Sequence, residues 1–355
     1  MFFLTSEQQA IFDVANTYPF GEDIDVEFEE YLYGNLARYI AVVPQNFQAG
    51  IIKQTLFKNE ALMDQFEEWC NNTIEQFTTN RNAIFAKRET IVERFNSTAQ
   101  TIFSQSLHDG EILNAEQQGT KFTLLLNMSG GFTAQSIVQL VFHDVQIEGE
   151  LDGYYVYDEL VETEDGFALR VLSSFGSPYM EWTVYFKDIT ANYLYRPAVY
   201  SELGEIATWE DYVAALNLND KYYIVQNMNF VEIDLSSLSQ TADGIFAGEV
   251  LLGGTFEEAR EQIYCATYED PYAHFSEPIP MNELQDAMFD LDQTMRVRAF
   301  NTAFALGEEV ASIVNEVLRK ANVHSEENMY FSIMATHFEK LGCLADDVKK
   351  KWIEE

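Results

Sequence analysis

Residues 122–142 read FTLLLNMSGGFTAQSIVQLVF and carry no charged side chain. Two apolar runs flank a polar middle that includes Asn127, Gly130 and Gly131. A membrane-spanning helix needs about 20 predominantly apolar residues, and the polar middle interrupts such a helix. The stretch therefore predicts two β-strands joined by a loop, and it predicts no transmembrane segment.

The strand pattern continues on both sides of this stretch. Hydrophobic residues alternate with a period of two from Leu107 to Tyr195, and turns that contain glycine or proline separate the runs. Because the connections are short, we expect neighbouring strands to pair as an antiparallel β-meander over residues 107–195. The expected strands are 111–117, 120–128, 137–147, 153–162, 167–174 and 180–187.

Helical periodicity of 3.6 residues marks the preceding segment. Residues 1–106 are predicted to be helical and to form one domain with residues 107–195. Ser6 and Gln9 have the spacing of a capping box, which predicts that Ser6 is the N-cap of the first helix.

A second domain is expected over residues 200–355, after a boundary near 196–205. It begins with strands at 221–235 and 244–252 and continues with a helix that Thr255 caps.

Helices are expected to end the chain, because Leu284, Met288 and Leu291 belong to one apolar stripe with helical spacing. The predicted fold class is therefore α+β. It comprises a helical N-terminal segment, an antiparallel β-meander and a second α+β unit that ends in helices.

The charge of the chain restricts its partners. Its 355 residues include 58 Asp and Glu against 21 Lys and Arg, a formal net charge of −37 at pH 7. Hydrophobic residues make up 47% of the chain, so a folded core is expected despite this charge. We expect no direct binding to nucleic acid or to a membrane, because both require a basic patch. The negative field instead favours a basic protein partner.

The three cysteines, Cys70, Cys265 and Cys343, lie far apart in the sequence. Their number and spacing predict neither a disulfide framework nor a zinc site. The N-terminal residues lack the basic region of a signal peptide. We therefore expect a cytoplasmic protein, and no motif predicts a cofactor.

Two His-Asp pairs, His108-Asp109 and His143-Asp144, are the candidate catalytic residues. If the sheet brought the pairs together, two imidazoles and two carboxylates would suit a divalent metal. In the other interpretation each Asp turns the chain and each His packs against its neighbours.

Acidic residues gather around two predicted hairpin turns. The segment from Glu148 to Gly153, with Glu159 further on, has the outline of a calcium loop, but its place between strands favours a hairpin. Turns at one end of a meander would present these acids together, so we predict that they bind the partner. The predicted partner-binding residues are Glu148, Glu150, Asp152, Glu162, Glu164 and Asp165.

Six short motifs follow one another in an order that resembles an uncharacterised family of bacterial proteins, mostly from Gram-positive species. The resemblance covers residues 1–195 and implies no known activity, because the family is a domain of unknown function. The motifs are Phe3-Leu4-Thr5-Ser6-Glu7, Val43-Pro44-Gln45-Asn46-Phe47, Leu107-His108-Asp109-Gly110-Glu111-Ile112, Leu124-x-Leu126-Asn127-x-Ser129-Gly130-Gly131-Phe132, Tyr155-x-Tyr157-x-Glu159 and Gly166-Phe167-x-Leu169-x-Val171-Leu172.

Two functions are consistent with these observations. The first is a non-enzymatic acidic binding protein, of the inhibitor or immunity type, that engages a basic or nucleic-acid-handling partner protein. The alternative is a metal-dependent hydrolase that uses His108, Asp109, His143 and Asp144. The sequence favours the first, because it contains no catalytic signature, and it does not predict an oligomeric state.

Overall fold

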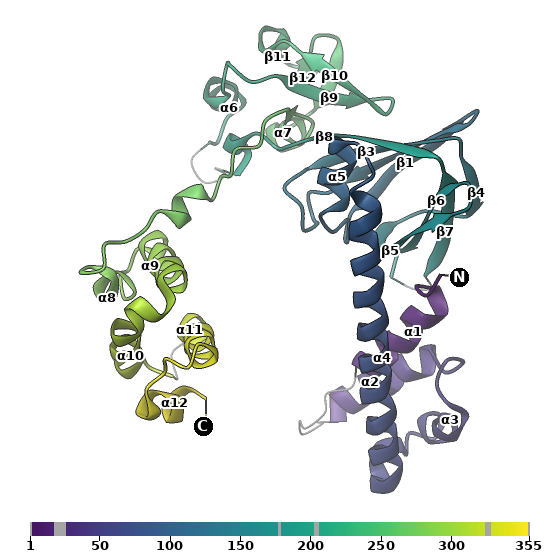
Figure 1. Cartoon of the computed structure of the whole chain (residues 1–355). Coiled ribbons are helices and arrows are strands. Elements are labelled where there is room, and N and C mark those ends of the chain that lie inside the picture. Colours follow the sequence, from purple (N-terminus) through teal and green to yellow (C-terminus); the bar gives the residue numbers. More distant parts are fainter. Residues whose placement is uncertain (1, 18–25, 177–178, 202–205, 324–327, 354–355) are drawn as a thin grey trace. The chain divides into compact units, whose positions relative to one another are not determined.

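The structure is a computed structural model, and it describes residues 2–17, 26–176, 179–201, 206–323 and 328–353. The chain forms two compact units, residues 1–268 and 269–355 (Figure 1). The first unit combines helices with one large and two small sheets, and the second is helical. The predicted α+β class is confirmed. The boundary expected near 196–205 lies inside the first unit.

The first unit contains seven α-helices within its described residues: α1 (Ser6–Asn16), α2 (Val26–Arg38), α3 (Gln45–Ile52), α4 (Glu60–Val92), α5 (Ser97–Phe103), α6 (Trp209–Ala215) and α7 (Phe256–Glu261). The strands of its large sheet are β1 (Glu111–Gln118), β2 (Lys121–Asn127), β3 (Ile137–His143), β4 (Gln146–Gly149), β5 (Tyr154–Thr163), β6 (Gly166–Ser174), β7 (Met180–Phe186) and β8 (Asp188–Leu194).

All pairs in the large sheet are antiparallel, as predicted, but their order differs from a simple meander. The order is β4-β7-β6-β5-β1-β2-β3-β8, so two three-stranded meanders, β1–β3 and β5–β7, meet where Glu111 pairs with Tyr154. The cause is a bend at Asp144, whose φ of 55° ends the expected strand 137–147 early. Before the bend, β3 pairs with β8. After the bend, β4 pairs with β7.

The bend joins the two ends of the sheet. His143 of β3 lies opposite Asp188 of β8, and Gln146 of β4 lies opposite Tyr185 of β7 in the same register. The Lys187 N–H donates to the His143 carbonyl at 3.0 Å and bridges the two ladders. Residues 137–149 and 182–194 are therefore two bent strands that pair along their length, and the sheet curls around its core.

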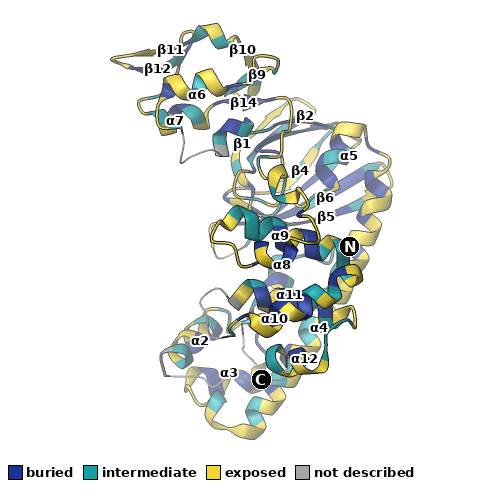
Figure 2. Cartoon of the chain, turned by 90° about the vertical axis from the view of Figure 1, so that its left-hand side faces the viewer, coloured by how far each residue is buried: buried dark blue, intermediate teal, exposed yellow. Residues whose placement is uncertain are grey.

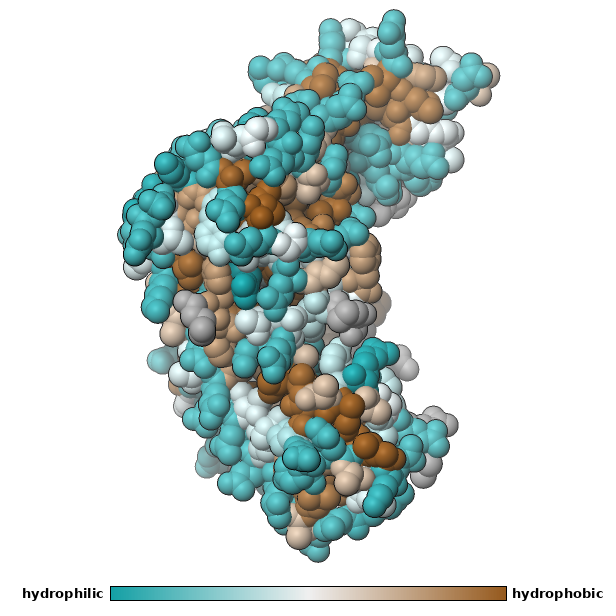
Figure 3. Space-filling view, turned by 90° about the vertical axis from the view of Figure 1, so that its right-hand side faces the viewer, coloured by the Kyte–Doolittle hydropathy of each residue, from teal (hydrophilic) through white to brown (hydrophobic). Residues whose placement is uncertain are grey.

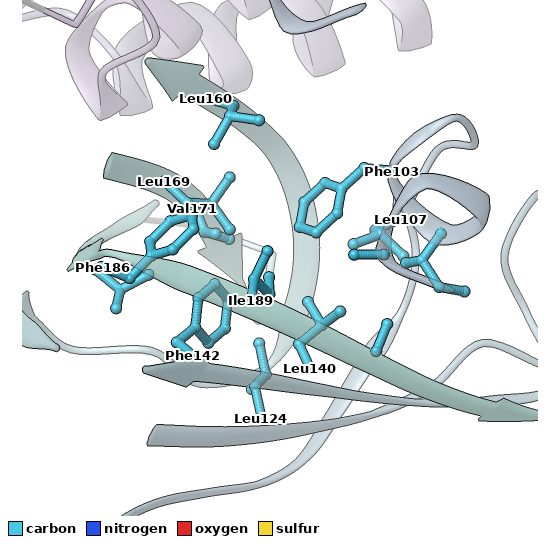
Figure 4. Close-up of a cluster of buried hydrophobic side chains, with 14 of the residues drawn as sticks. Phe103, Leu107, Leu124, Leu140, Phe142, Leu160, Leu169, Val171, Phe186 and Ile189 are labelled. Carbon is cyan, nitrogen blue, oxygen red and sulfur yellow. The ribbon is translucent and has the colours of Figure 1, made fainter. Parts of the chain in front are cut away.

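The core lies inside this curl. Figure 4 shows Phe103 and Leu107, from the end of α5 and the loop after it, pointing at side chains of the strands. Burial of one such side chain stabilises the fold by about 1.5–3 kcal/mol, and Figure 2 shows buried positions along β5 and β6. Ten side chains labelled in Figure 4 are buried: Phe103, Leu107, Leu124, Leu140, Phe142, Leu160, Leu169, Val171, Phe186 and Ile189.

The two strands within the uncharged stretch 122–142, β2 and β3, are buried on both faces of the sheet. Leu124 and Leu140 face the core inside the curl, whereas Leu125 and Ile137 belong to a second buried cluster with Tyr264. This second cluster is covered by residues of the small sheets. A strand that is covered on both faces has no solvated side on which to place a charge, which explains the composition of the stretch.

The small sheets have the orders β10-β9-β14 and β11-β12-β13. The expected strand 221–235 is a hairpin, because Asn227 and Met228 both adopt positive φ, 47° and 63°. Thr255 caps α7 as predicted, accepting from the Glu258 N–H at 3.2 Å. The strands are β9 (Tyr222–Gln226), β10 (Asn229–Ile233), β11 (Leu238–Thr241), β12 (Gly244–Ala247), β13 (Val250–Gly253) and β14 (Tyr264–Cys265).

Helix α4 has 33 residues and is about 50 Å long at 1.5 Å per residue. Phe77 of α4 stacks on Phe12 of α1 with ring centroids 4.2 Å apart, and Phe66 meets Phe47 of α3 edge to face at 5.3 Å. Its last turns pack on β5. The predicted helical N-terminal segment is thus anchored to the sheet within one compact unit.

The segment before α1 is held by two carboxylates of the sheet. Glu159 is 5% exposed, and it accepts hydrogen bonds from the Phe3 and Leu4 N–H groups at 2.7 and 2.8 Å. Glu181 accepts from the N–H and the hydroxyl of Ser6 at 2.7 and 2.8 Å. Burial tends to raise the pKa of Glu181, but these bonds and Arg170 hold the pKa below its usual value.

The expected cap of the first helix at Ser6 is wrong by one residue. Thr5 is the N-cap, and its hydroxyl accepts from the Gln8 N–H at 3.1 Å. The physical reason is that the Ser6 hydroxyl donates to Glu181, so it is directed at the sheet.

A buried ion pair joins the end of α4 to β5. The Arg88 guanidinium bonds to Asp158 and donates from Nε to the Phe103 carbonyl at 3.2 Å, while the Tyr155 hydroxyl donates to Asp158 at 2.9 Å. Arg88 and Asp158 are 9% and 5% exposed. Burial, and then the charge of Asp158, raises the pKa of Tyr155, which keeps its proton.

The second unit contains the helices α8 (Leu284–Ala287), α9 (Gln293–Leu306), α10 (Ala311–Lys320), α11 (Asn328–Lys340) and α12 (Asp346–Trp352). Leu284 and Met288 are fully buried, as the apolar stripe predicts, but Leu291 is 98% exposed. The assignment of Leu291 to the stripe was wrong, because α8 ends at Ala287, before this residue. Asn315 fastens α10 to the segment before α12, donating to the Cys343 carbonyl and accepting from the Ala345 N–H at 2.9 and 2.7 Å.

We expect Asp158→Ala to lower the free energy of unfolding by about 3–5 kcal/mol, because it leaves the Arg88 guanidinium buried without its carboxylate. Glu162→Ala is the matched control, since it breaks the exposed pair with Arg94 and costs less than about 1 kcal/mol. Urea unfolding measures both. The double variant Arg88→Met/Asp158→Leu should recover most of the loss, and equal effects of the two single variants would contradict the assignment.

Candidate functional site

The residues of three family motifs meet around His108, in the loop between α5 and β1. The His108 ring stacks between Phe132 and Tyr157, with centroid distances of 6.0 and 5.3 Å and interplanar angles of 7° and 8°. Its Nδ1 lies 2.7 Å from the Val156 carbonyl oxygen. A carbonyl accepts only, so Nδ1 carries the proton and donates. The motif order in the sequence thus reflects a packed cluster.

Two glycines allow this cluster to close. A Cβ at Gly110 would lie 2.5 Å from the Met128 Sδ, and one at Gly131 would lie 2.9 Å from the Met128 Cε. Asp109 turns the chain with a φ of 64°. The packing interpretation of the first His-Asp pair therefore has a direct structural basis.

One side of the stack is open to solvent. Phe132 is 72% exposed, and the His108 side chain is 34% exposed. The Nε2 of His108 is 3.8 Å from the Asp109 Oδ1, which is too long for a hydrogen bond. The arrangement offers an aromatic surface rather than an oriented acid–base pair.

The structure separates the two His-Asp pairs. His143 lies opposite Lys121 at one end of the β2–β3 hairpin, whereas His108 lies beside Met128 at the other end. About 20 Å of strand lies between the ends. No group of three metal-ligating side chains occurs among the described residues. The hydrolase alternative requires the two His-Asp pairs to lie together, and the structure places these four described residues apart.

The segment with the calcium-loop outline connects β4 to β5, and the predicted hairpin there is wrong: after the bend at Asp144, β4 pairs with β7, whereas β5 pairs with β6 and β1. Gly153 has a φ of 81°, and its N–H donates to the Asp152 carboxylate at 2.8 Å. Glu159 is engaged with Phe3 and Leu4, and it is therefore held away from the loop. The segment joins β4 to β5, not one helix to another.

The six predicted partner-binding acids form two groups, not one. Glu148, Glu150 and Asp152 lie on β4 and in its connection to β5, whereas Glu164 and Asp165 form the turn between β5 and β6. The expectation that one end of the sheet presents all of them was wrong, because β5 separates the two turns along its length. Glu162 lies near the second turn and pairs with Arg94 at 2.8 Å.

The β5–β6 turn borders a cavity of about 480 Å³, which we call the acidic hollow. Asp144, predicted from the sequence as part of a His-Asp pair, also lines the acidic hollow, because the bend after β3 brings it beside the β5–β6 turn. The feature that reveals this placement is the positive φ of Asp144, which the sequence alone does not show. Four charged residues line the acidic hollow: Asp144, Glu164, Asp165 and Lys187.

A larger cavity of about 590 Å³ lies beside α4 and α5, lined by Phe85, Arg88, Phe103 and Gln105 among others. Arg88 is its buried charge, and Asp158 and the Phe103 carbonyl already bind this guanidinium. This cavity is therefore a weaker candidate for a charged ligand than the acidic hollow.

A family model described as "Protein of unknown function (DUF4085)" matches residues 3–186. The match covers the N-terminal helices and the large sheet up to β7, and the chain belongs to this family. No curated protein and no solved structure matches the chain. Within the described residues, none of the helices combines the length and apolar character needed to cross a membrane.

We expect His108→Ala to lower the free energy of unfolding by about 1–3 kcal/mol, through loss of the stacked rings and of the bond to Val156. His143→Ala should cost less than about 1 kcal/mol, because no ring stacks on His143 within the described residues. Chemical unfolding gives both values. Stoichiometric zinc or manganese in the purified protein, lost in either variant, would contradict this structural role and favour the hydrolase.

Proposed function

We propose that this chain is a non-enzymatic, cytoplasmic binding protein of the inhibitor or immunity type. Its acidic surface engages a basic partner protein, for example one that handles nucleic acids. The observation that carries the proposal is the acidic hollow, where Asp144, Glu164 and Asp165 share a cavity with one lysine. A cytoplasmic location is supported by Cys70, Cys265 and Cys343, none of which forms a disulfide.

The acidic hollow suits an arginine or lysine side chain. A cavity of about 480 Å³ is larger than one such side chain requires, and its carboxylates attract a guanidinium through charge-assisted hydrogen bonds. Phe167 and Tyr185 also line it, and aromatic rings stack favourably on a guanidinium plane. The pocket thus combines charge with an apolar wall, as is typical of protein interaction sites.

The rest of the surface supports attraction at long range. A net charge of −37 produces a negative field around the chain, which accelerates encounter with a basic protein. Figure 3, drawn from the side on which β4 lies in Figure 1, shows a largely hydrophilic surface interrupted by separate hydrophobic patches. The alternative hydrolase has no comparable support, because the hairpin separates its two His-Asp pairs.

Charge reversal tests the surface directly. We expect Glu164→Lys/Asp165→Lys to weaken capture of the partner from a lysate of the native host at least tenfold, because it replaces two carboxylates of the acidic hollow. The matched control is Glu150→Lys/Asp152→Lys, which makes the same charge change at the other turn and should reduce capture by less than threefold. Circular dichroism verifies that both variants are folded. Equal loss in both would show that only total charge matters, and unchanged capture in the first would exclude the hollow.

Salt dependence tests the electrostatic mechanism. With the captured partner, the association rate should fall steeply as ionic strength rises, while the dissociation rate changes much less. Stopped-flow mixing at increasing salt gives both rates. The same protein should show no measurable binding to double-stranded DNA or to RNA at physiological salt. Tight nucleic-acid binding would overturn the proposal.

A further inference from the structure

Two arginines meet at one aromatic ring in the region that follows the large sheet. Arg196 comes directly after β8 and Tyr195, and Arg260 lies on α7. Both guanidinium carbons lie over the ring of Tyr200, each 5.0 Å from its centroid. The two guanidinium carbons are therefore at most about 10 Å apart, in a chain that has few bases.

Further aromatic rings surround the two guanidiniums. Arg196 also lies over Tyr264 at 4.3 Å, and Arg260 lies over Phe256 at 5.5 Å. The ring of Tyr212, from α6, packs against Phe256 at 5.8 Å and is 1% exposed. The rings hold the guanidiniums in place without neutralising their charge.

Neither guanidinium has a carboxylate partner within the described residues, although acids outnumber bases by 58 to 21. Other arginines of the chain do find carboxylates, such as Arg94 with Glu162 and Arg298 with Glu277. Arg196 donates from Nη1 to the Glu261 carbonyl. In the part of the chain that the structure describes, no carboxylate thus pairs with either guanidinium.

Three polar atoms in this cluster are buried without a hydrogen-bond partner among the described residues: the Nε atoms of Arg196 and Arg260 and the hydroxyl of Tyr212. A buried donor without a partner is costly, and a charged one more so. Burial raises the pKa of Tyr212, so its hydroxyl remains a donor, and both arginines act on it electrostatically. All three atoms are therefore donors that lack an acceptor within the described residues.

We propose that Arg196, Arg260 and Tyr212 bind a small oxyanion of the phosphate type. A phosphate dianion matches two guanidinium charges, and its oxygens accept from several donors at once. The site lies outside residues 3–186, the part of the chain that the family model matches. It is separate from the acidic hollow, so either proposal can fail without the other.

The test uses the full chain and inorganic phosphate, followed by calorimetry and by thermal unfolding at constant ionic strength. We expect phosphate to bind the wild type and to raise its melting temperature. Arg260→Ala should weaken binding at least tenfold, and Arg260→Lys should weaken it less, because it keeps the charge but loses the planar donor group. Arg319→Ala is the matched control: it removes one positive charge, from the pair with Asp347 in the second unit, and should change affinity by less than twofold.

Tyr212→Phe removes only the buried hydroxyl and serves where an arginine variant does not fold. It should weaken phosphate binding about three- to tenfold, the effect of losing one hydrogen bond, with an unchanged circular dichroism spectrum. Phenyl phosphate distinguishes a phosphate ester from free phosphate: tighter binding than inorganic phosphate indicates an ester, and weaker binding indicates the free ion.

Three results would overturn the proposal. The first is no phosphate binding to the wild type at tens of millimolar. The second is an equal response to acetate at the same ionic strength, which would show that any anion suffices. The third concerns Glu202 and Glu205, which follow Tyr200 in the sequence. If phosphate binds only after Glu202→Gln/Glu205→Gln, carboxylates of this chain already neutralise the arginines.

Discussion

The ladder between residues 137–149 and 182–194 is the constraint on which the first unit depends. Because both strands bend and keep the same register across the bend, the two meanders face each other and enclose one core. The Lys187 N–H bond to His143 spans the point where the pairing changes from β3·β8 to β4·β7. The same bend places Asp144 beside the β5–β6 turn, so the curl of the sheet and the acidic hollow have one origin.

Much of this fold can be predicted from local patterns. Alternating hydrophobicity locates the strands, and Thr255 marks the start of α7, because both signals come from residues close in the sequence. Strand order depends on a single positive φ at Asp144, and no local pattern encodes it. Leu291 shows the same limit, since helical spacing continued in the sequence after the helix had ended.

The candidate sites were harder to predict than the fold. His108 attracts a catalytic interpretation from its neighbour Asp109, yet its Nδ1 is engaged with Val156 and its ring is stacked on two aromatic residues. The six predicted acids are exposed, as expected. Their division into two groups depends on the strand order, because β4 pairs with β7 and not with β5. The sequence does not predict that Arg196 and Arg260 both lie over Tyr200, because the two arginines are far apart in the chain.

The bonds that Glu159 makes to Phe3 and Leu4 also have a consequence for synthesis of the chain. The Phe3–Glu159 and Ser6–Glu181 bonds span 156 and 175 residues, so the start of α1 cannot find its carboxylates until β5 and β7 have left the ribosome. At about 5–20 residues per second this interval is roughly 10–30 s. During that time the aromatic faces of α1 and α4 lack the sheet against which they fold, and a chaperone that shields such surfaces would act in this window.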